Sequence, residues 1–234
     1  LWDVESSKVR QTLSDHTSWV ESVAYSPDGR TLASGSDEVI LWDAASGSKL
    51  RTINPPQFYA IHIAFSPDGF SLATTGDDLI LWNTGSGAKI RTFKGSTRQV
   101  AFSPDGATLA SDFGDSHSIA LWQVASGKQE NILGGHTGEV TGVAYSPDGR
   151  TVASQSDLSV ILWDAASGAR LHSIPGSYSS GELAFSPDGK TLAVAAWFSV
   201  RLLDAISGKL VKELSSPDGQ ASSLAYSPDG ATLA

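Results

Sequence analysis

The chain has 234 residues, of which 40% are hydrophobic and 18% charged, so it can build a substantial core and is too apolar to be disordered. Its formal net charge of −9 repels phosphate backbones and anionic lipid, which argues against nucleic acid and membrane partners. The absence of cysteine excludes disulfides and thiol catalysis, and no run of about 18 apolar residues is present that could cross a membrane.

Two short motifs recur in step along the chain. Ser-Pro-Asp-Gly occurs at 26–29, 66–69, 103–106, 146–149, 186–189 and 227–230. A second motif, Leu-Trp-Asp or a close variant, is centred on Trp2, Trp42, Trp82, Trp122, Trp163 and Leu203. A period of about 40 residues, with apolar residues at every second position, predicts four-stranded propeller blades and disfavours a helical array.

The first complete unit shows how one blade is built. Val20–Tyr25 leads into the Ser-Pro-Asp-Gly turn at 26–29 and Thr31–Ser34 leads away from it, as the strands of a hairpin do. Proline at the second turn position and glycine at the fourth favour a type I turn with a bulge. A third strand, Val39–Trp42, is followed by a small-residue turn and by a fourth strand, Lys49–Ile53. The unit is therefore predicted to be a four-stranded antiparallel meander.

The later units repeat this plan, and the two ends of the chain supply parts of one more. Residues 1–13 carry the last two strands of a unit, and 221–234 carry the first strand and the start of the second. We predict an all-β fold, a β-propeller of four-stranded antiparallel blades with six repeats visible, the sixth shared between the termini and incomplete. A ring of seven or more blades is the alternative. Residues 1–234 are expected to form a single domain, a segment of a longer protein.

These motifs resemble those of the WD-repeat family of β-propellers, in the prokaryotic type of the repeat. The likeness covers essentially the whole chain and includes Gly-His-Thr at 135–137. It implies a scaffold or sensor module, which in microbes is often joined to a kinase, a protease-like domain or a nucleotide-binding switch ATPase. We also expect a cytoplasmic protein.

The resemblance further implies a buried polar network in each blade. In the family it runs from the tryptophan of the third strand to a Ser or Thr of the second, then to a histidine before the first strand and an aspartate after the second. Two units match in full, with His16, Ser34, Asp37 and Trp42, and with His136, Ser154, Asp157 and Trp163. An unpaired buried donor costs on the order of 1 to 3 kcal/mol, so we interpret these residues as structural and not as a catalytic triad.

The fifth unit lacks all four polar residues of the network. Gly176, Val194, Trp197 and Leu203 stand in the places of His, Ser, Asp and Trp. Joint replacement of a hydrogen-bonded set by apolar groups can be nearly neutral, whereas loss of one member strands the others. We therefore expect apolar packing in this blade.

Function is expected where the units differ. The turns between first and second strands and between third and fourth strands are nearly uniform and share one side of a blade, here called the turn side. The second-to-third loops and the connections between units share the opposite side, the loop side, and they vary. Aromatic residues and two charged residues there are predicted to bind a protein or peptide partner. They are Trp19, Glu21, Phe58, Tyr59, Arg98, Phe113, Tyr178, Trp197 and Phe198. Alternatively, several of the aromatics fill gaps between blades.

The strand predicted to line the propeller axis offers few polar groups for catalysis. Its carboxylates are Glu21 and Glu182, and the remaining histidines, His62, His117 and His172, are scattered. Hydrolytic propellers need a cluster of such groups on the axis. We therefore predict no enzyme, no metal and no cofactor. The alternative is a small-ligand-binding or hydrolytic propeller that uses the axial pocket.

Overall fold

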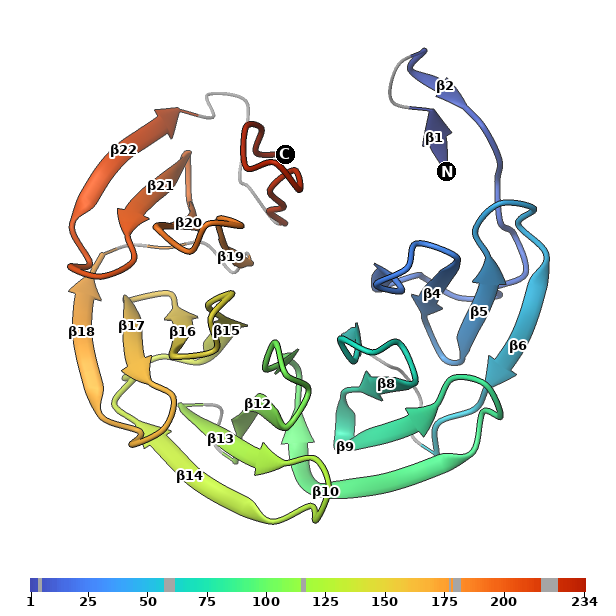
Figure 1. Cartoon of the computed structure of the whole chain (residues 1–234), viewed down its shortest axis with the longest axis horizontal. Coiled ribbons are helices and arrows are strands. Elements are labelled where there is room, and N and C mark those ends of the chain that lie inside the picture. The colour runs from blue at the N-terminus through green and yellow to red at the C-terminus, as the bar shows by residue number, and fades with distance from the viewer. Residues whose placement is uncertain (4–5, 57–61, 115–116, 177, 179–181, 216–222) are drawn as a thin grey trace. The chain divides into compact units, whose positions relative to one another are not determined.

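The computed structural model describes residues 1–3, 6–56, 62–114, 117–176, 178, 182–215 and 223–234 (Figure 1). Within these residues the chain forms strands and turns and no helix. The strands make five four-stranded sheets and one two-stranded sheet in the described part of the chain. The prediction of an all-β fold of four-stranded antiparallel blades of the β-propeller type is therefore confirmed.

Residues 1–92 form one compact unit and residues 93–234 another, and each is described by itself. In the first unit, β3–β6 make one blade and β7–β10 the next, while β1 pairs with β2 alone in a two-stranded sheet. The strands are β1 (Trp2–Asp3), β2 (Lys8–Val9), β3 (Ser22–Tyr25), β4 (Thr31–Gly35), β5 (Val39–Asp43), β6 (Lys49–Ile53), β7 (Ile63–Phe65), β8 (Ser71–Thr74), β9 (Gly76–Asn83) and β10 (Lys89–Thr97). Strand β10 begins in this unit and ends in the second.

The second unit holds the other blades, β11–β14, β15–β18 and β19–β22. Its strands are β11 (Val100–Phe102), β12 (Thr108–Phe113), β13 (Ser118–Gln123), β14 (Gln129–Gly134), β15 (Val140–Tyr145), β16 (Thr151–Ser156), β17 (Ser159–Asp164), β18 (Arg170–Pro175), β19 (Leu183–Phe185), β20 (Thr191–Ala196), β21 (Ser199–Asp204) and β22 (Leu210–Ser215). Beyond them, Tyr226 and Leu233 form an isolated antiparallel bridge. The sharing of one blade by the two ends of the chain stays a prediction.

Each Ser-Pro-Asp-Gly turn is closed by hydrogen bonds among its own residues. In the first, the Asp28 carboxylate accepts from the Ser26 hydroxyl at 2.7 Å and from Arg30 N at 3.0 Å, while Ser26 Oγ accepts from Thr31 N at 2.9 Å. Gly29 has a φ of 69°, in the left-handed region that favours glycine. The same bonds recur in every copy of the turn. The polar groups of the turn side therefore satisfy one another.

Apolar residues at every second strand position form the core between neighbouring blades. In the first unit, Ala33 and Leu41 of one blade pack with Ile63, Leu72 and Trp82 of the next. Equivalent clusters join the blades of the second unit. Burial of both faces explains why the inner strands read as nearly continuous apolar runs.

An arginine on an outer strand also links two blades on the turn side. The Arg51 guanidinium donates to the carbonyl oxygens of Gly85 at 2.6 Å and Ser86 at 2.9 Å, in the turn of the following blade. Gln11 donates in the same way to the Ser46 carbonyl at 2.8 Å. The turn side is thus held together between blades as well as within them.

Candidate protein interaction surface

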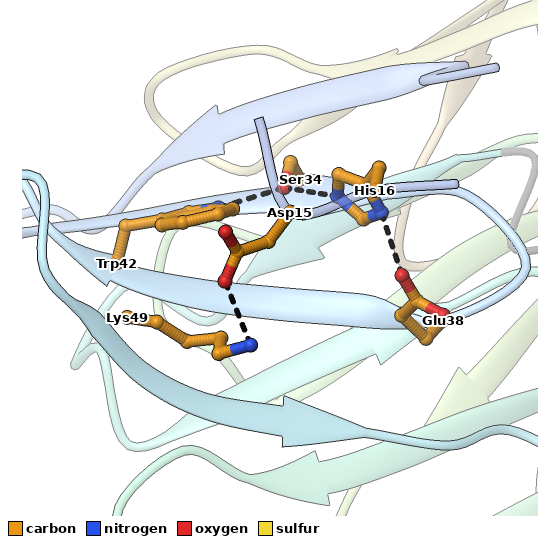
Figure 2. A network of polar contacts seen from close by, with 6 residues as sticks. All are labelled: Asp15, His16, Ser34, Glu38, Trp42 and Lys49. Carbon is orange, nitrogen blue, oxygen red and sulfur yellow. Dashed lines mark hydrogen bonds and ion pairs between the residues drawn. The ribbon is translucent and has the colours of Figure 1, made fainter. Parts of the chain in front are cut away.

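Figure 2 shows the polar network of the first blade, which joins Trp42, Ser34, His16 and Glu38. The Trp42 indole donates to Ser34 Oγ at 2.8 Å, and Ser34 Oγ is 2.6 Å from His16 Nε2. His16 Nδ1 lies 3.0 Å from Glu38 Oε1. Because an indole can only donate, Ser34 accepts from Trp42 and donates to Nε2, which leaves the Nδ1 hydrogen for Glu38. Each polar group therefore has a partner.

Glu38 holds the place in this network that the sequence analysis assigned to Asp37. Both residues lie in the turn between β4 and β5, which is closed by a bond from Ser36 N to the Glu38 carbonyl at 2.9 Å. Asp37 at the tip is exposed, whereas Glu38 is half-buried and its longer side chain reaches the imidazole. The position after the tip, and not the tip itself, directs its carboxylate to His16.

The fourth blade repeats the network with hydroxyls in place of a carboxylate. Trp163 donates to Ser154 Oγ at 2.8 Å, and His136 Nε2 is 2.7 Å from the same oxygen. His136 Nδ1 lies 3.1 Å from Ser156 Oγ and 3.0 Å from Ser159 Oγ. Two serine hydroxyls thus accept what a carboxylate accepts in the first blade.

Asp157, the residue predicted for that role, is exposed and makes no hydrogen bond to His136 in the described chain. Burial lowers the pKa of His136 to about 4, so the imidazole is neutral at neutral pH. A neutral imidazole needs only hydroxyl acceptors, which explains why no carboxylate is required. The geometry suits a packed structural group.

The third and fifth blades fill the corresponding volume with aromatic rings. The rings of Phe93 and Phe113 meet the Trp122 ring edge-on, with centroids 5.6 and 5.7 Å away. In the fifth blade Tyr178 is 1% exposed and packs with Val194 and Leu203, the residues in the places of Ser and Trp. The expected apolar packing of the fifth blade is therefore present.

Two of the predicted partner-binding residues are thus engaged inside blades. Phe113 packs on Trp122, and Tyr178 lies in the core with the Arg201 guanidinium 5.4 Å from its ring centroid. Tyr178 was predicted as an accessible anchor, and burial overturns that prediction. The physical reason is that small or aliphatic residues in the network positions leave a volume that a nearby loop aromatic fills.

Three of the predicted aromatics are accessible on the loop side. Trp19, before β3, is 85% exposed, and Trp197 and Phe198 are 49% and 69% exposed. Ala196 pairs with Ser199 across β20 and β21, so Trp197 and Phe198 form the tip of a two-residue turn. Phe58 and Tyr59 lie outside the described residues. Exposed rings on loops are the kind of side chain that anchors a partner.

The two predicted charged residues are also on the surface. Arg98 Nη1 lies 3.1 Å from Glu139 Oε2, and both side chains are more than half exposed. Glu21 is exposed, and its backbone N donates to the Gly35 carbonyl at 2.9 Å. The sequence analysis missed Glu139, although it lies one repeat after Arg98 and the repeat alignment could have found it. It also missed Leu158, which is 52% exposed at the β16–β17 turn.

A buried carboxylate at Asp112 orders the start of the first strand of the third blade. Its Oδ1 accepts from Arg98 N and from Gln99 N, each at 2.8 Å. Burial raises the pKa of Asp112, while these two backbone donors oppose that shift. The loop-side position of Arg98 thus depends on a group that the sequence analysis did not single out.

Exposed apolar side chains occur on the turn side as well. Phe70 is 71% exposed beside a Ser-Pro-Asp-Gly turn, and Ile206 is 83% exposed in the β21–β22 turn. Because they are similarly exposed, they can serve as turn-side controls in experiments on Trp19 and Phe198.

No group of His, Cys, Asp and Glu in the described residues could hold a metal ion. Over the same residues, no helix is long and apolar enough to cross a membrane.

Comparison with known proteins finds matches to individual repeats of the chain. The family model described as "WD domain, G-beta repeat" matches residues 7–43, 87–123 and 127–164. A stretch of 38 residues is 53% identical to apoptotic protease-activating factor 1 of Danio rerio. This match covers 16% of the present chain and 3% of that protein.

Proposed function

We propose that this chain, which carries WD repeats, is a non-catalytic interaction scaffold or sensor module whose loop side binds a protein or peptide partner. WD repeats are generally protein-interaction scaffolds. The observation that carries the proposal is the exposure of Trp19, Trp197 and Phe198 at 85%, 49% and 69% on loops that vary between units. Large exposed rings lose little conformational entropy on binding and bury much area, so they serve as anchors.

The difference between the two sides of the blades supports this choice of surface. On the turn side the polar groups of the repeated turns are hydrogen-bonded to one another, and outer-strand side chains such as Arg51 cover the neighbouring turn. Uniform and internally satisfied turns offer little that is specific to one partner. The loops differ in length and in side chains, which is where specificity is usually carried.

Two broader parts of the proposal concern the whole protein. We propose that residues 1–234 act as one propeller domain of a longer protein, and that an attached kinase, protease-like domain or nucleotide-binding switch ATPase responds to the bound partner. The cytoplasmic location stays a prediction.

Site-specific photo-cross-linking tests which side of the blades meets a partner. A photoreactive phenylalanine analogue is placed at position 19 or 198 on the loop side, or at position 70 or 206 on the turn side. These references are similarly exposed, so chance encounters label both sides alike. We expect a discrete cross-linked protein from positions 19 and 198 only. Equal labelling from both sides, or labelling from the turn side alone, contradicts the proposal.

A further inference from the structure

Charge is distributed unevenly between the two sides of the first unit, residues 1–92. Its described loop-side segments 14–21, 36–38 and 75–78 contain acidic residues and neither Lys nor Arg. The acidic residues are Asp15, Glu21, Asp37, Glu38, Asp77 and Asp78. All basic residues of the unit lie elsewhere, at Lys8, Arg10, Arg30, Lys49, Arg51, Lys89 and Arg91.

Some of these carboxylates are already engaged within the unit. Lys49 Nζ lies 2.7 Å from Asp15 Oδ2, and Glu38 is bonded to His16 (Figure 2). By contrast, Glu21, Asp37 and Asp77 are exposed and form no ion pair with any described residue. The loop side of this unit therefore keeps uncompensated negative charge.

The exposed indole of Trp19 lies in the same region of the chain. The Glu21 N to Gly35 carbonyl bond, 2.9 Å long, holds the segment before β3 beside the β4–β5 turn that carries Asp37. Trp19 and Val20, in that segment, are 85% and 47% exposed. A large apolar group and two free carboxylates therefore lie on adjacent segments.

The β4–β5 turn also contains a polar group without a partner. Ser36 is 2% exposed, and its hydroxyl meets no hydrogen-bond partner in the described part of the chain. Buried polar groups in native proteins usually find a partner in protein, water or a ligand. The turn thus combines charge, exposure and an unmet hydrogen bond.

We infer that this acidic loop surface, comprising Trp19, Val20, Glu21 and Asp37, binds a cationic segment of the partner, a stretch of Lys or Arg with apolar neighbours. The face of an indole attracts an ammonium or guanidinium group, and free carboxylates pair with the same groups. The surrounding negative charge steers cationic segments toward the surface and repels acidic ones. This inference rests on the proposed function and names the chemistry of its partner.

The inference is tested on the full chain with three fluorescein-labelled peptides of equal length. All three contain Leu and Gly, and they differ only in the residue that alternates with these: Lys in the first, Gln in the second and Glu in the third. Binding is followed by fluorescence anisotropy at low and high salt. We expect the Lys peptide to bind most tightly, with an affinity that falls as salt rises. Trp19→Ala should weaken it by about 2- to 30-fold, the range expected for a cation over an aromatic ring. Glu21→Gln with Asp37→Asn should reduce both affinity and salt dependence.

Phe70→Ala is the matched control, because Phe70 is similarly exposed on the turn side and should leave binding unchanged. Trp19→Phe keeps a ring and should retain most of the affinity, and thermal unfolding shows whether each variant is folded. If the Gln or Glu peptide binds the chain as tightly as the Lys peptide, and Trp19→Ala weakens that binding too, the inference that the partner segment is cationic is overturned. The proposed function then still stands. If Phe70→Ala weakens binding as much as Trp19→Ala, the binding surface is not confined to the loop side. Both this inference and the proposed function are then wrong about its location.

Discussion

Glu38 accepts a hydrogen bond from His16 Nδ1, 3.0 Å away, and so completes the polar network that begins at the Trp42 indole. In the fourth blade two serine hydroxyls take the same role. The blades therefore keep the histidine satisfied with different acceptors.

Glu38→Ala should be more damaging than Asp37→Ala. The His16 side chain is only 6% exposed, so removal of Glu38 leaves its Nδ1 hydrogen without an acceptor and should lower the free energy of unfolding by about 1 kcal/mol. Asp37 is exposed at the turn tip, so its removal should change that energy by less than about 0.5 kcal/mol. Urea unfolding followed by tryptophan fluorescence measures both. Equal losses would mean that Asp37 belongs to the network after all.

The repeated turns should make the protein sensitive to acid. The Ser186 hydroxyl and the Lys190 backbone N lower the pKa of Asp188 to about 2 from an ordinary 3.8, and the pKa of the aspartate is lowered in the other copies too. A carboxyl whose folded pKa is depressed stabilises the fold above its unfolded pKa, and that contribution is lost as the pH falls from about 4 to 2. Melting temperatures measured across this range should fall.

Asp188→Asn provides the control for the acid prediction. Asparagine keeps an acceptor oxygen and does not titrate, so the variant should lose less stability between pH 4 and 2 than the parent chain, with its starting stability somewhat lower. A parent and a variant with the same pH profile would show that this turn does not contribute.

His136 should titrate far below an ordinary histidine. Burial lowers its pKa to about 4 from 6.5, so the folded state disfavours the imidazolium more than the unfolded state does. The stability that depends on the neutral ring is present above about pH 6.5 and is lost as the pH falls toward 4. Imidazole NMR signals followed with pH in the folded chain and in urea measure the difference. Titration near 6.5 in the folded chain would contradict the packed network.

Truncation to alanine should lower the stability of the protein much more at Tyr178 than at Trp197. Tyr178→Ala removes a core ring beside Val194 and Leu203 and should lower the free energy of unfolding by about 3 kcal/mol or more. Trp197→Ala removes a half-exposed ring at a turn tip and should change it by less than about 1 kcal/mol. Denaturant unfolding compares them, with Tyr178→Phe as the mild control that keeps the ring. A small loss for Tyr178→Ala would return this residue to the binding surface.

Much of the fold follows from contacts that are close together in the sequence. Ser26, Asp28 and Gly29 close their turn with bonds that span five residues or fewer, so the same four letters form the same turn in every copy. The alternation of apolar residues then assigns the faces of each strand. For these reasons the repeated blades could be predicted from the sequence. The Trp42–Ser34–His16 part of the network was expected from the resemblance to WD repeats.

By itself the sequence determined the repeat, the turns and the apolar strands, because period and turn chemistry are local properties. Only the tertiary structure decided which loop side chains are free. Tyr178 and Trp197 are both aromatic residues near variable loops, yet one is buried and the other is half exposed. Asp37 and Glu38 are adjacent acids, yet only Glu38 reaches His16. Those outcomes depend on the space that distant residues leave and on the direction in which each side chain points. Neither can be read from the spacing of residues in the sequence.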